Sequence, residues 1–145
     1  MPPAYVSVVT IGVRDLPRMR AFYAALGWEI AVDMDDFVAF ETRGAVLTLY
    51  ALEKLAADSN VAVASQERSI GGFNLAVNVD RIEQVDESIE TARAAGAEIA
   101  KEPYTADWGG RTAYFLDPED NLWELAWVPP ESVVGGLVRR ARGEG

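Results

Sequence analysis

The sequence predicts an α+β protein built from two consecutive βαβββ modules. Runs rich in valine, isoleucine, threonine and aromatic residues are typical of strands, and stretches with apolar residues at helical spacing are typical of helices. The order of these elements repeats in the second half of the chain, which indicates a doubled supersecondary unit. Of the 145 residues, 50% are hydrophobic, so we expect one folded domain over residues 1–130 and a tail at 131–145.

The first module is expected at about residues 4–52. It opens with a strand at 5–13, after which Asp15 has the side chain of a helix N-cap and Pro17 suits the first helical turn. Gly27 ends this helix, because glycine readily adopts the backbone conformation that follows a helix. Three strand-like runs follow, at 28–33, 37–42 and 45–52.

The second module is expected at 73–130, after a polar, alanine-rich linker at 53–72 that has room for a short helix. A strand at 73–79 precedes a helical stripe that closes at Gly96. The segment 104–110, which contains a tryptophan and two glycines, either borders a ligand site or extends a hairpin. The remaining strands are expected at 98–104, 111–116 and 122–128.

The composition excludes several classes of function. Lysine and arginine number 13 against 23 aspartates and glutamates, a net charge of −10, whereas nucleic-acid binding requires a basic face. A cationic ligand would be attracted instead. No run is long enough to cross a membrane and no signal peptide is recognisable, so we expect a cytoplasmic protein with neither nucleic acid nor membrane as partner. The chain has no histidine and no cysteine, which excludes disulfides and thiol catalysis.

Two segments carry a resemblance to a known family. The first is VVTIGVRDL at 8–16 with RAFYAALG at 20–27, and the second is YFLDPEDNLWEL at 114–125. Together, in the doubled βαβββ order, they resemble the vicinal oxygen chelate superfamily, which includes glyoxalase, bleomycin-resistance proteins, fosfomycin-resistance enzymes and extradiol dioxygenases. The resemblance implies a cupped mixed β-sheet formed by both modules, with helices on its outer face, and a homodimer.

In the metal-dependent enzymes of this superfamily, the first and last strands of each module supply the metal ligands. The resemblance places these positions on Val8, Thr48, Asn74 and Glu124, and only Glu124 matches the family pattern. Valine has no lone pair, and the neutral oxygens of threonine and asparagine bind zinc, nickel or iron poorly. We therefore expect no metal and no other cofactor, while a weak magnesium or calcium site with several waters stays open as an alternative.

Strand alternation predicts which side chains share the cup with Glu124. The first strand of each module and the strand paired with it contribute small apolar and neutral polar groups, and residues near the long second-module loop are expected at the rim. The candidate ligand-binding residues are Val8, Thr10, Thr48, Tyr50, Asn74, Asn78, Trp108, Arg111, Tyr114 and Glu124.

Three functions are compatible with this site. The first is metal-independent binding of a small molecule in the cup, as in the bleomycin-resistance branch. The second is a lyase or isomerase of glyoxalase type, in which Glu124 is the catalytic base or the ligand of a weakly held divalent metal. In the third, the protein's own side chains fill the cup and function lies at an interface. Glu124 itself is either functional or a structural acid hydrogen-bonded by Asn74 or Thr48.

The tail at 131–145 departs from the repeat. Ser132 or Glu131 can open a short helix, and three arginines give the end of the chain a basic character. This tail either frays or packs on a partner subunit.

Overall fold

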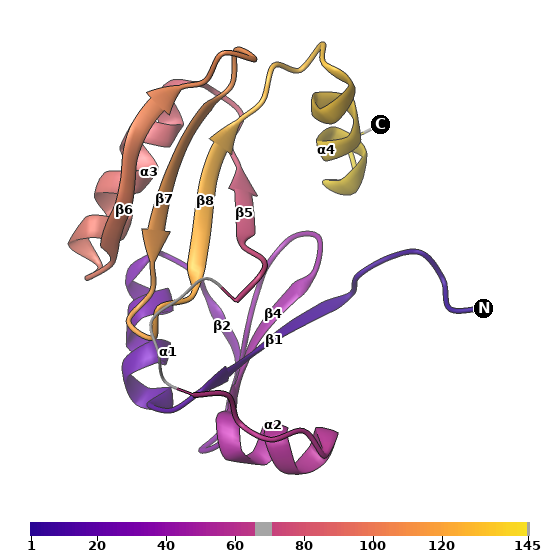
Figure 1. The fold of residues 1–145 in the computed structure, drawn as a ribbon, viewed down its shortest axis with the longest axis vertical. Helices are drawn as coiled ribbons and strands as arrows, with labels where there is room; N and C mark the ends of the chain where they lie inside the picture. Colours follow the sequence, from indigo (N-terminus) through magenta and orange to yellow (C-terminus); the bar gives the residue numbers. More distant parts are fainter. Residues whose placement is uncertain (66–70, 145) are drawn as a thin grey trace. The chain divides into compact units, whose positions relative to one another are not determined.

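The computed structural model describes residues 1–65 and 71–144 and contains two compact units, Met1–Glu67 and Arg68–Gly145 (Figure 1). Each unit holds its own four-stranded mixed sheet, and the predicted α+β arrangement of two βαβββ modules is confirmed. The elements are β1 Val8–Val13, α1 Leu16–Ala25, β2 Ile30–Asp33, β3 Phe37–Phe40, β4 Val46–Ala51, α2 Leu52–Ser59, β5 Leu75–Asn78, α3 Glu83–Ala94, β6 Glu98–Thr105, β7 Arg111–Leu116, β8 Leu122–Trp127 and α4 Val133–Ala141.

The sheet of the first unit has the order β1-β4-β3-β2, with β1 and β4 parallel and the other pairs antiparallel. Helix α1 lies against this sheet and starts as predicted, because the carboxylate of Asp15 accepts a 3.1 Å hydrogen bond from the backbone N–H of Arg18. The helix buries Met19 and Tyr23 completely, and the Tyr23 ring lies 5.8 Å from that of Phe40 on β3. This apolar layer forms the core of the first unit.

The sheet of the second unit has the corresponding order β5-β8-β7-β6, with β5 and β8 parallel. Helix α3 lies along one face of β6, β7 and β8 (Figure 1) and buries Val85 and Ile89. On the strands, Phe115 and Trp123 are buried with their rings stacked at 6.2 Å. One face of this sheet therefore packs against α3 and forms the core of the second unit.

Several boundaries differ from the sequence predictions. The first strand begins at Val8 rather than at residue 5, and β5 begins at Leu75 rather than at 73. The linker predicted at 53–72 contains the short helix for which it had room, but this helix, α2, begins directly after β4. It ends at Asn60, which has the left-handed conformation with φ 56°. The part of that linker at 66–70 lies outside the described residues.

The tail forms α4 and does not fray over its described length. Ser132 caps the helix as predicted, accepting a 3.0 Å hydrogen bond from the N–H of Gly135. Arg142, just beyond the helix, pairs with Asp80 at 2.5 Å and with Glu144 at 3.2 Å. Contacts within the second unit therefore hold the end of the chain.

Over residues 1–65 and 71–144, the structure contains no helix with the length and apolarity needed to span a membrane.

We expect Gly135→Ala to destabilise α4 and Gly136→Ala to leave it intact. A Cβ atom at Gly135 would lie 2.2 Å from the backbone oxygen of Pro129, so backbone must move, at a cost of about 1–3 kcal/mol. At Gly136 the nearest atom is 3.6 Å away, at the end of the Arg140 side chain, and alanine gains up to about 1 kcal/mol of helix propensity. Urea denaturation with circular dichroism measures both. Equal stability of the two variants would contradict the close packing of Gly135.

Candidate functional site

One face of the second sheet carries polar side chains from all four strands. Because directly paired residues lie on the same face of a sheet, the strand pairing defines two neighbouring rows across β5, β8, β7 and β6. The first row is Ala76, Glu124, Tyr114 and Lys101. The second row is Asn78, Ala126, Thr112 and Tyr104. We call this surface the Glu124 face and include Asn74, which contacts Glu124 from the chain just before β5.

Glu124 lies near the middle of the first row and is half-buried. The side-chain amide of Asn74 donates a 3.1 Å hydrogen bond to Oε2 of Glu124, one of the two interactions expected for this acid. On the neighbouring strand, burial and then the negative charge of Glu124 raise the pKa of the Tyr114 phenol. Tyr114 therefore keeps its proton at neutral pH and presents a hydroxyl donor beside a carboxylate.

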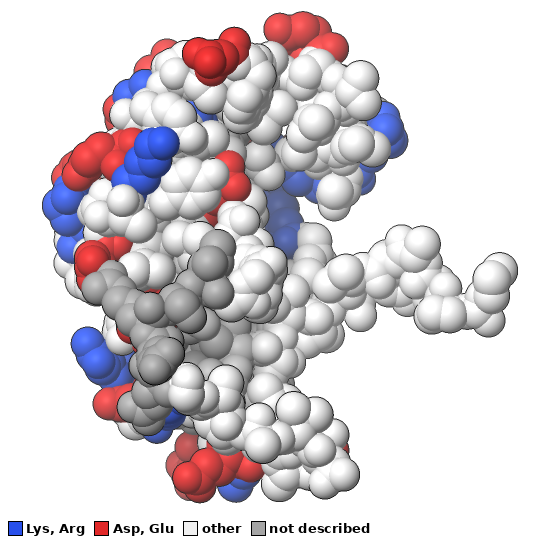
Figure 2. Space-filling view, in the orientation of Figure 1, with Lys and Arg blue, Asp and Glu red and all other residues white. Residues whose placement is uncertain are grey.

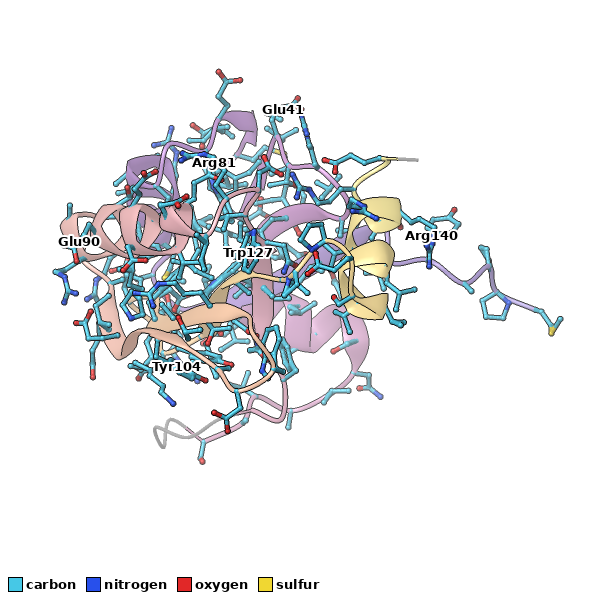
Figure 3. The ribbon with its side chains drawn as sticks, turned by 90° about the horizontal axis from the view of Figure 1, so that it is seen from above. Glu41, Arg81, Glu90, Tyr104, Trp127 and Arg140 are labelled. Atoms are coloured by element: carbon cyan, nitrogen blue, oxygen red, sulfur yellow. The ribbon has the colours of Figure 1, made fainter. Side chains whose placement is uncertain are left out.

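Lys101 and Tyr104 lie on β6 at the other end of the two rows. The ammonium of Lys101 lies 3.7 Å from the centroid of the Tyr104 ring, a cation–π contact. The Thr112 hydroxyl first, and the charge of Lys101 in addition, lower the pKa of the Tyr104 phenol despite its burial. Thr112 is 2% exposed, and its hydroxyl has no hydrogen bond of normal geometry to any residue in 1–65 or 71–144. Figure 3 labels Tyr104.

Arg111 does not belong to the Glu124 face. It is paired across strands with Trp127, so it points to the face that α3 covers. There its guanidinium contacts Asp86 of α3 through Nε at 2.6 Å and Nη2 at 2.7 Å, and Thr105 through Nη1 at 3.2 Å. The Arg111 hydrogen bonds hold the pKa of the Asp86 carboxyl below its usual range. The structure thus separates Arg111 from Glu124 and Tyr114, with which the sequence analysis had grouped it.

Trp108 occupies a turn between β6 and β7 rather than the sheet. The N–H of Ala106 donates to the oxygen of Gly110 at 2.8 Å, which closes the hairpin. The indole lies over Gly110, since a Cβ atom there would come within 1.9 Å of the ring. Trp108 is nonetheless 58% exposed. The loop therefore has the geometry of a hairpin extension whose tryptophan covers the backbone of its own turn.

In the first unit the candidate residues form a separate group. The hydroxyl of Thr48 is 2.8 Å from that of Thr10 on the paired strand, and Thr48 is buried. The phenol of Tyr50 donates a 2.8 Å hydrogen bond to Asp58 of α2, which is the main cause of a raised Tyr50 pKa. Val8 is 51% exposed at the start of β1. Pairing places Val8, Thr10 and Tyr50 on the same face of the first sheet as Thr48.

A small hollow lies beside α4 in the second unit. Its volume is about 80 Å³, and Asn78, Trp127, Gly135, Arg139 and Arg142 are among its lining residues. The basic side chains of this helix are visible in Figure 2. Of the two arginines that line the hollow, Arg142 is already paired with Asp80 and Glu144.

Comparison with known families and solved structures identifies the class of the protein. A family model described as Glyoxalase/Bleomycin resistance protein/Dioxygenase superfamily matches residues 5–125. A glyoxalase/bleomycin resistance protein/dioxygenase family enzyme from Burkholderia phytofirmans PsJN is 30% identical, with a TM-score of 0.74 over 87% of this chain and 100% of that one. The chain therefore belongs to the glyoxalase/bleomycin resistance protein/dioxygenase superfamily.

Other solved structures agree in fold. A glyoxalase-related enzyme from Fulvimarina pelagi is 29% identical, with a TM-score of 0.80 over 88% of this chain and 90% of that one. A lactoylglutathione lyase from Agrobacterium tumefaciens, 22% identical with a TM-score of 0.67 over 87% of this chain and 95% of that one, supports the fold alone. Among curated proteins, none matches the chain in sequence.

The donor set of the Glu124 face does not fit a tightly bound transition metal. The chain supplies no histidine or cysteine, and no three acidic side chains gather at metal-binding distance anywhere in the described residues. Asn74 turns its amide N–H₂ toward Glu124, and Lys101 adds a positive charge to the same row. One carboxylate beside these groups is a poor site for zinc, iron or nickel.

The Asp86–Arg111 pair gives a testable pH dependence. Because the folded pKa of Asp86 is lowered, the pair stabilises the fold above the ordinary aspartate pKa of about 4, and this contribution disappears as the pH falls through the lower folded pKa. Wild-type protein should therefore lose more unfolding free energy between about pH 6 and about pH 2 than Asp86→Asn does. The difference should stay below about 1 kcal/mol, since Asp86 is half exposed.

Urea denaturation at both pH values measures this difference. Asp107→Asn, which removes an exposed carboxylate in the turn between β6 and β7, is the matched control and should behave as the wild type. An equal loss in wild type and Asp86→Asn would show that the ion pair adds nothing to stability.

Proposed function

We propose that this protein binds a small organic molecule on the Glu124 face of its second unit, without a tightly held transition metal. The observation that carries the proposal is the position of Glu124, half-buried on a central strand between Asn74 and Tyr114. A fixed carboxylate beside neutral donors orients a ligand but offers a divalent ion too few ligands. The excess of negative charge favours a ligand with a cationic or hydrogen-bond-donating end.

The first-unit candidates Val8, Thr10, Thr48 and Tyr50 are proposed separately, as candidate ligand contacts on the sheet of the first unit. Thr10 and Thr48 already form a hydrogen bond with each other. A ligand that displaces water from beside them therefore leaves neither hydroxyl without a partner.

We also propose a cytoplasmic homodimer, as the family resemblance implies. The glyoxalase-related enzyme from Fulvimarina pelagi and the family enzyme from Burkholderia phytofirmans PsJN make an enzymatic role the second candidate.

The enzymatic alternative is a lyase or isomerase with Glu124 as general base. One observation favours it: Tyr114 pairs directly with Glu124 on the neighbouring strand, which brings a phenol beside the carboxylate. A base and a proton donor on adjacent strands are the groups needed for a proton transfer within one substrate. Such a reaction needs no metal, whereas a divalent ion held weakly by Glu124 would have water as most of its ligands.

We predict that tag-free protein binds no stoichiometric zinc, nickel or iron. With one carboxylate and no histidine or cysteine, affinities for these ions should be no tighter than about millimolar. Elemental analysis and calorimetric titration test this. If the protein binds an ion tightly and Glu124→Ala loses it, the proposal of metal-independent binding is wrong and a metal-dependent enzyme becomes the first candidate.

We predict that Glu124→Gln weakens binding of benzylammonium, a minimal cationic probe, by about tenfold while the fold is unchanged. The expected loss corresponds to about 1.4 kcal/mol, the lower end of what one hydrogen bond to a charged group contributes. Titration followed by ¹⁵N–¹H NMR measures the affinity, and the spectrum of the variant reports its fold. Glu131→Gln removes the same charge from an exposed position outside the sheet and should bind as the wild type. Equal affinity of Glu124→Gln and wild type would contradict the proposed site.

A further inference from the structure

We infer that Lys101, Tyr104 and Thr112 form a carboxylate-binding subsite on the Glu124 face, so that the natural ligand has a carboxylate at one end and a cation or hydrogen-bond donor at the other. The inference rests on the function proposed above and specifies the chemistry of its ligand. None of these three residues was recognised as a site residue from the sequence.

The three side chains come together through an irregularity in β6. Lys101 pairs with Tyr114, and Tyr104 pairs with Thr112, although Lys101 and Tyr104 are an odd number of residues apart. A register shift between them restores both side chains to the same face. Glu124 lies on that face two strands away from Lys101, which corresponds to about 10 Å between their backbones.

Lys101 is available for an anionic ligand. It is exposed, and no carboxylate of the described residues forms an ion pair with it, whereas Arg20, Lys54, Arg93 and Arg111 each have one. Its contact is the aromatic face of Tyr104 at 3.7 Å. An ammonium has three donors, so this contact leaves donors free for a ligand.

Thr112 supplies an independent indication of a ligand. Its hydroxyl is buried, belongs to the same face, and has no hydrogen-bond partner of normal geometry among the described residues. Leaving a buried hydroxyl without a partner is unfavourable, and a bound oxygen acceptor that reaches it would remove this cost.

The charges on this face favour a carboxylate over a phosphate. One ammonium balances a single negative charge, whereas phosphate sites normally use arginine forks or the backbone N–H groups of a helix N-terminus. Glu124 in the same row would repel a dianion more strongly than a monoanion. A ligand with one carboxylate and one cationic end satisfies Lys101 and Glu124 together.

Three matched probes test this inference on the full chain. 4-(Aminomethyl)benzoate carries both charges on a rigid ring, benzylammonium lacks the carboxylate, and benzoate lacks the cation. By ¹⁵N–¹H NMR titration, the bifunctional probe should bind wild-type protein about tenfold more tightly than either single-charge probe. Lys101→Met should weaken 4-(aminomethyl)benzoate and benzoate about tenfold and should not weaken benzylammonium, because it removes a positive charge from the same row.

Two further variants separate the subsite from a general charge effect. Thr112→Val removes the hydroxyl at nearly constant shape and should weaken only the probes that carry a carboxylate. Arg140→Met removes the same charge as Lys101→Met from the exposed surface of α4 and should change nothing. The spectrum of each variant confirms that it is folded.

The outcomes distinguish this inference from the function on which it rests. If Lys101→Met binds benzoate and the bifunctional probe as the wild type does, or if neither probe binds at millimolar concentration, the carboxylate subsite is overturned. The proposed function stands in that case as long as Glu124→Gln still weakens benzylammonium. A benzylammonium affinity that is insensitive to Glu124→Gln overturns the proposed function, whatever the carboxylate probes show.

Discussion

Parallel pairing of the first and last strands is the constraint on which each unit depends. β1 pairs in parallel with β4, and β5 with β8, whereas all other strand pairs are antiparallel. Parallel neighbours cannot be joined by a tight turn, so the chain must leave the sheet, form a helix and return through further strands. The last strand thereby becomes an inner strand with a neighbour on each side. Glu124 is half-buried between Asn74 and Tyr114 because β8 has this central position.

The two faces of the second sheet use their positive charges in different ways. On the α3 face, Arg111 meets Asp86 through two hydrogen bonds, a fork geometry that arginine forms well with a carboxylate. On the Glu124 face, Lys101 rests on an aromatic ring instead. Arg111 therefore links α3 to the sheet through its ion pair with Asp86. The ammonium of Lys101 still has N–H donors that a ligand could use.

Much of this could be predicted from the sequence, and the errors have physical causes. The element order, the doubled βαβββ plan and the Asn74–Glu124 contact follow from hydrophobic periodicity, family resemblance and strand alternation. Arg111 was misplaced although it lies three residues from Tyr114 on a regular strand, a spacing that already puts the two on opposite faces. Lys101 and Tyr104 were beyond such reasoning, because alternation separates them and only the register shift in β6 brings them together.

The family resemblance places Glu124 at the position of a metal ligand, but the surroundings of this carboxylate differ from those of a metal centre. A metal centre concentrates several donors on one ion, whereas here a tyrosine stands between a carboxylate and an ammonium in one row across the strands. A divalent cation near Glu124 would meet the positive field of Lys101, and a simple anion near Lys101 would meet the negative field of Glu124. A molecule with both charges is favoured at each end, and the strand spacing fixes how far apart they must be. The proposed site would therefore select its ligand by charge separation, a property that neither the fold family nor the net charge of −10 reveals.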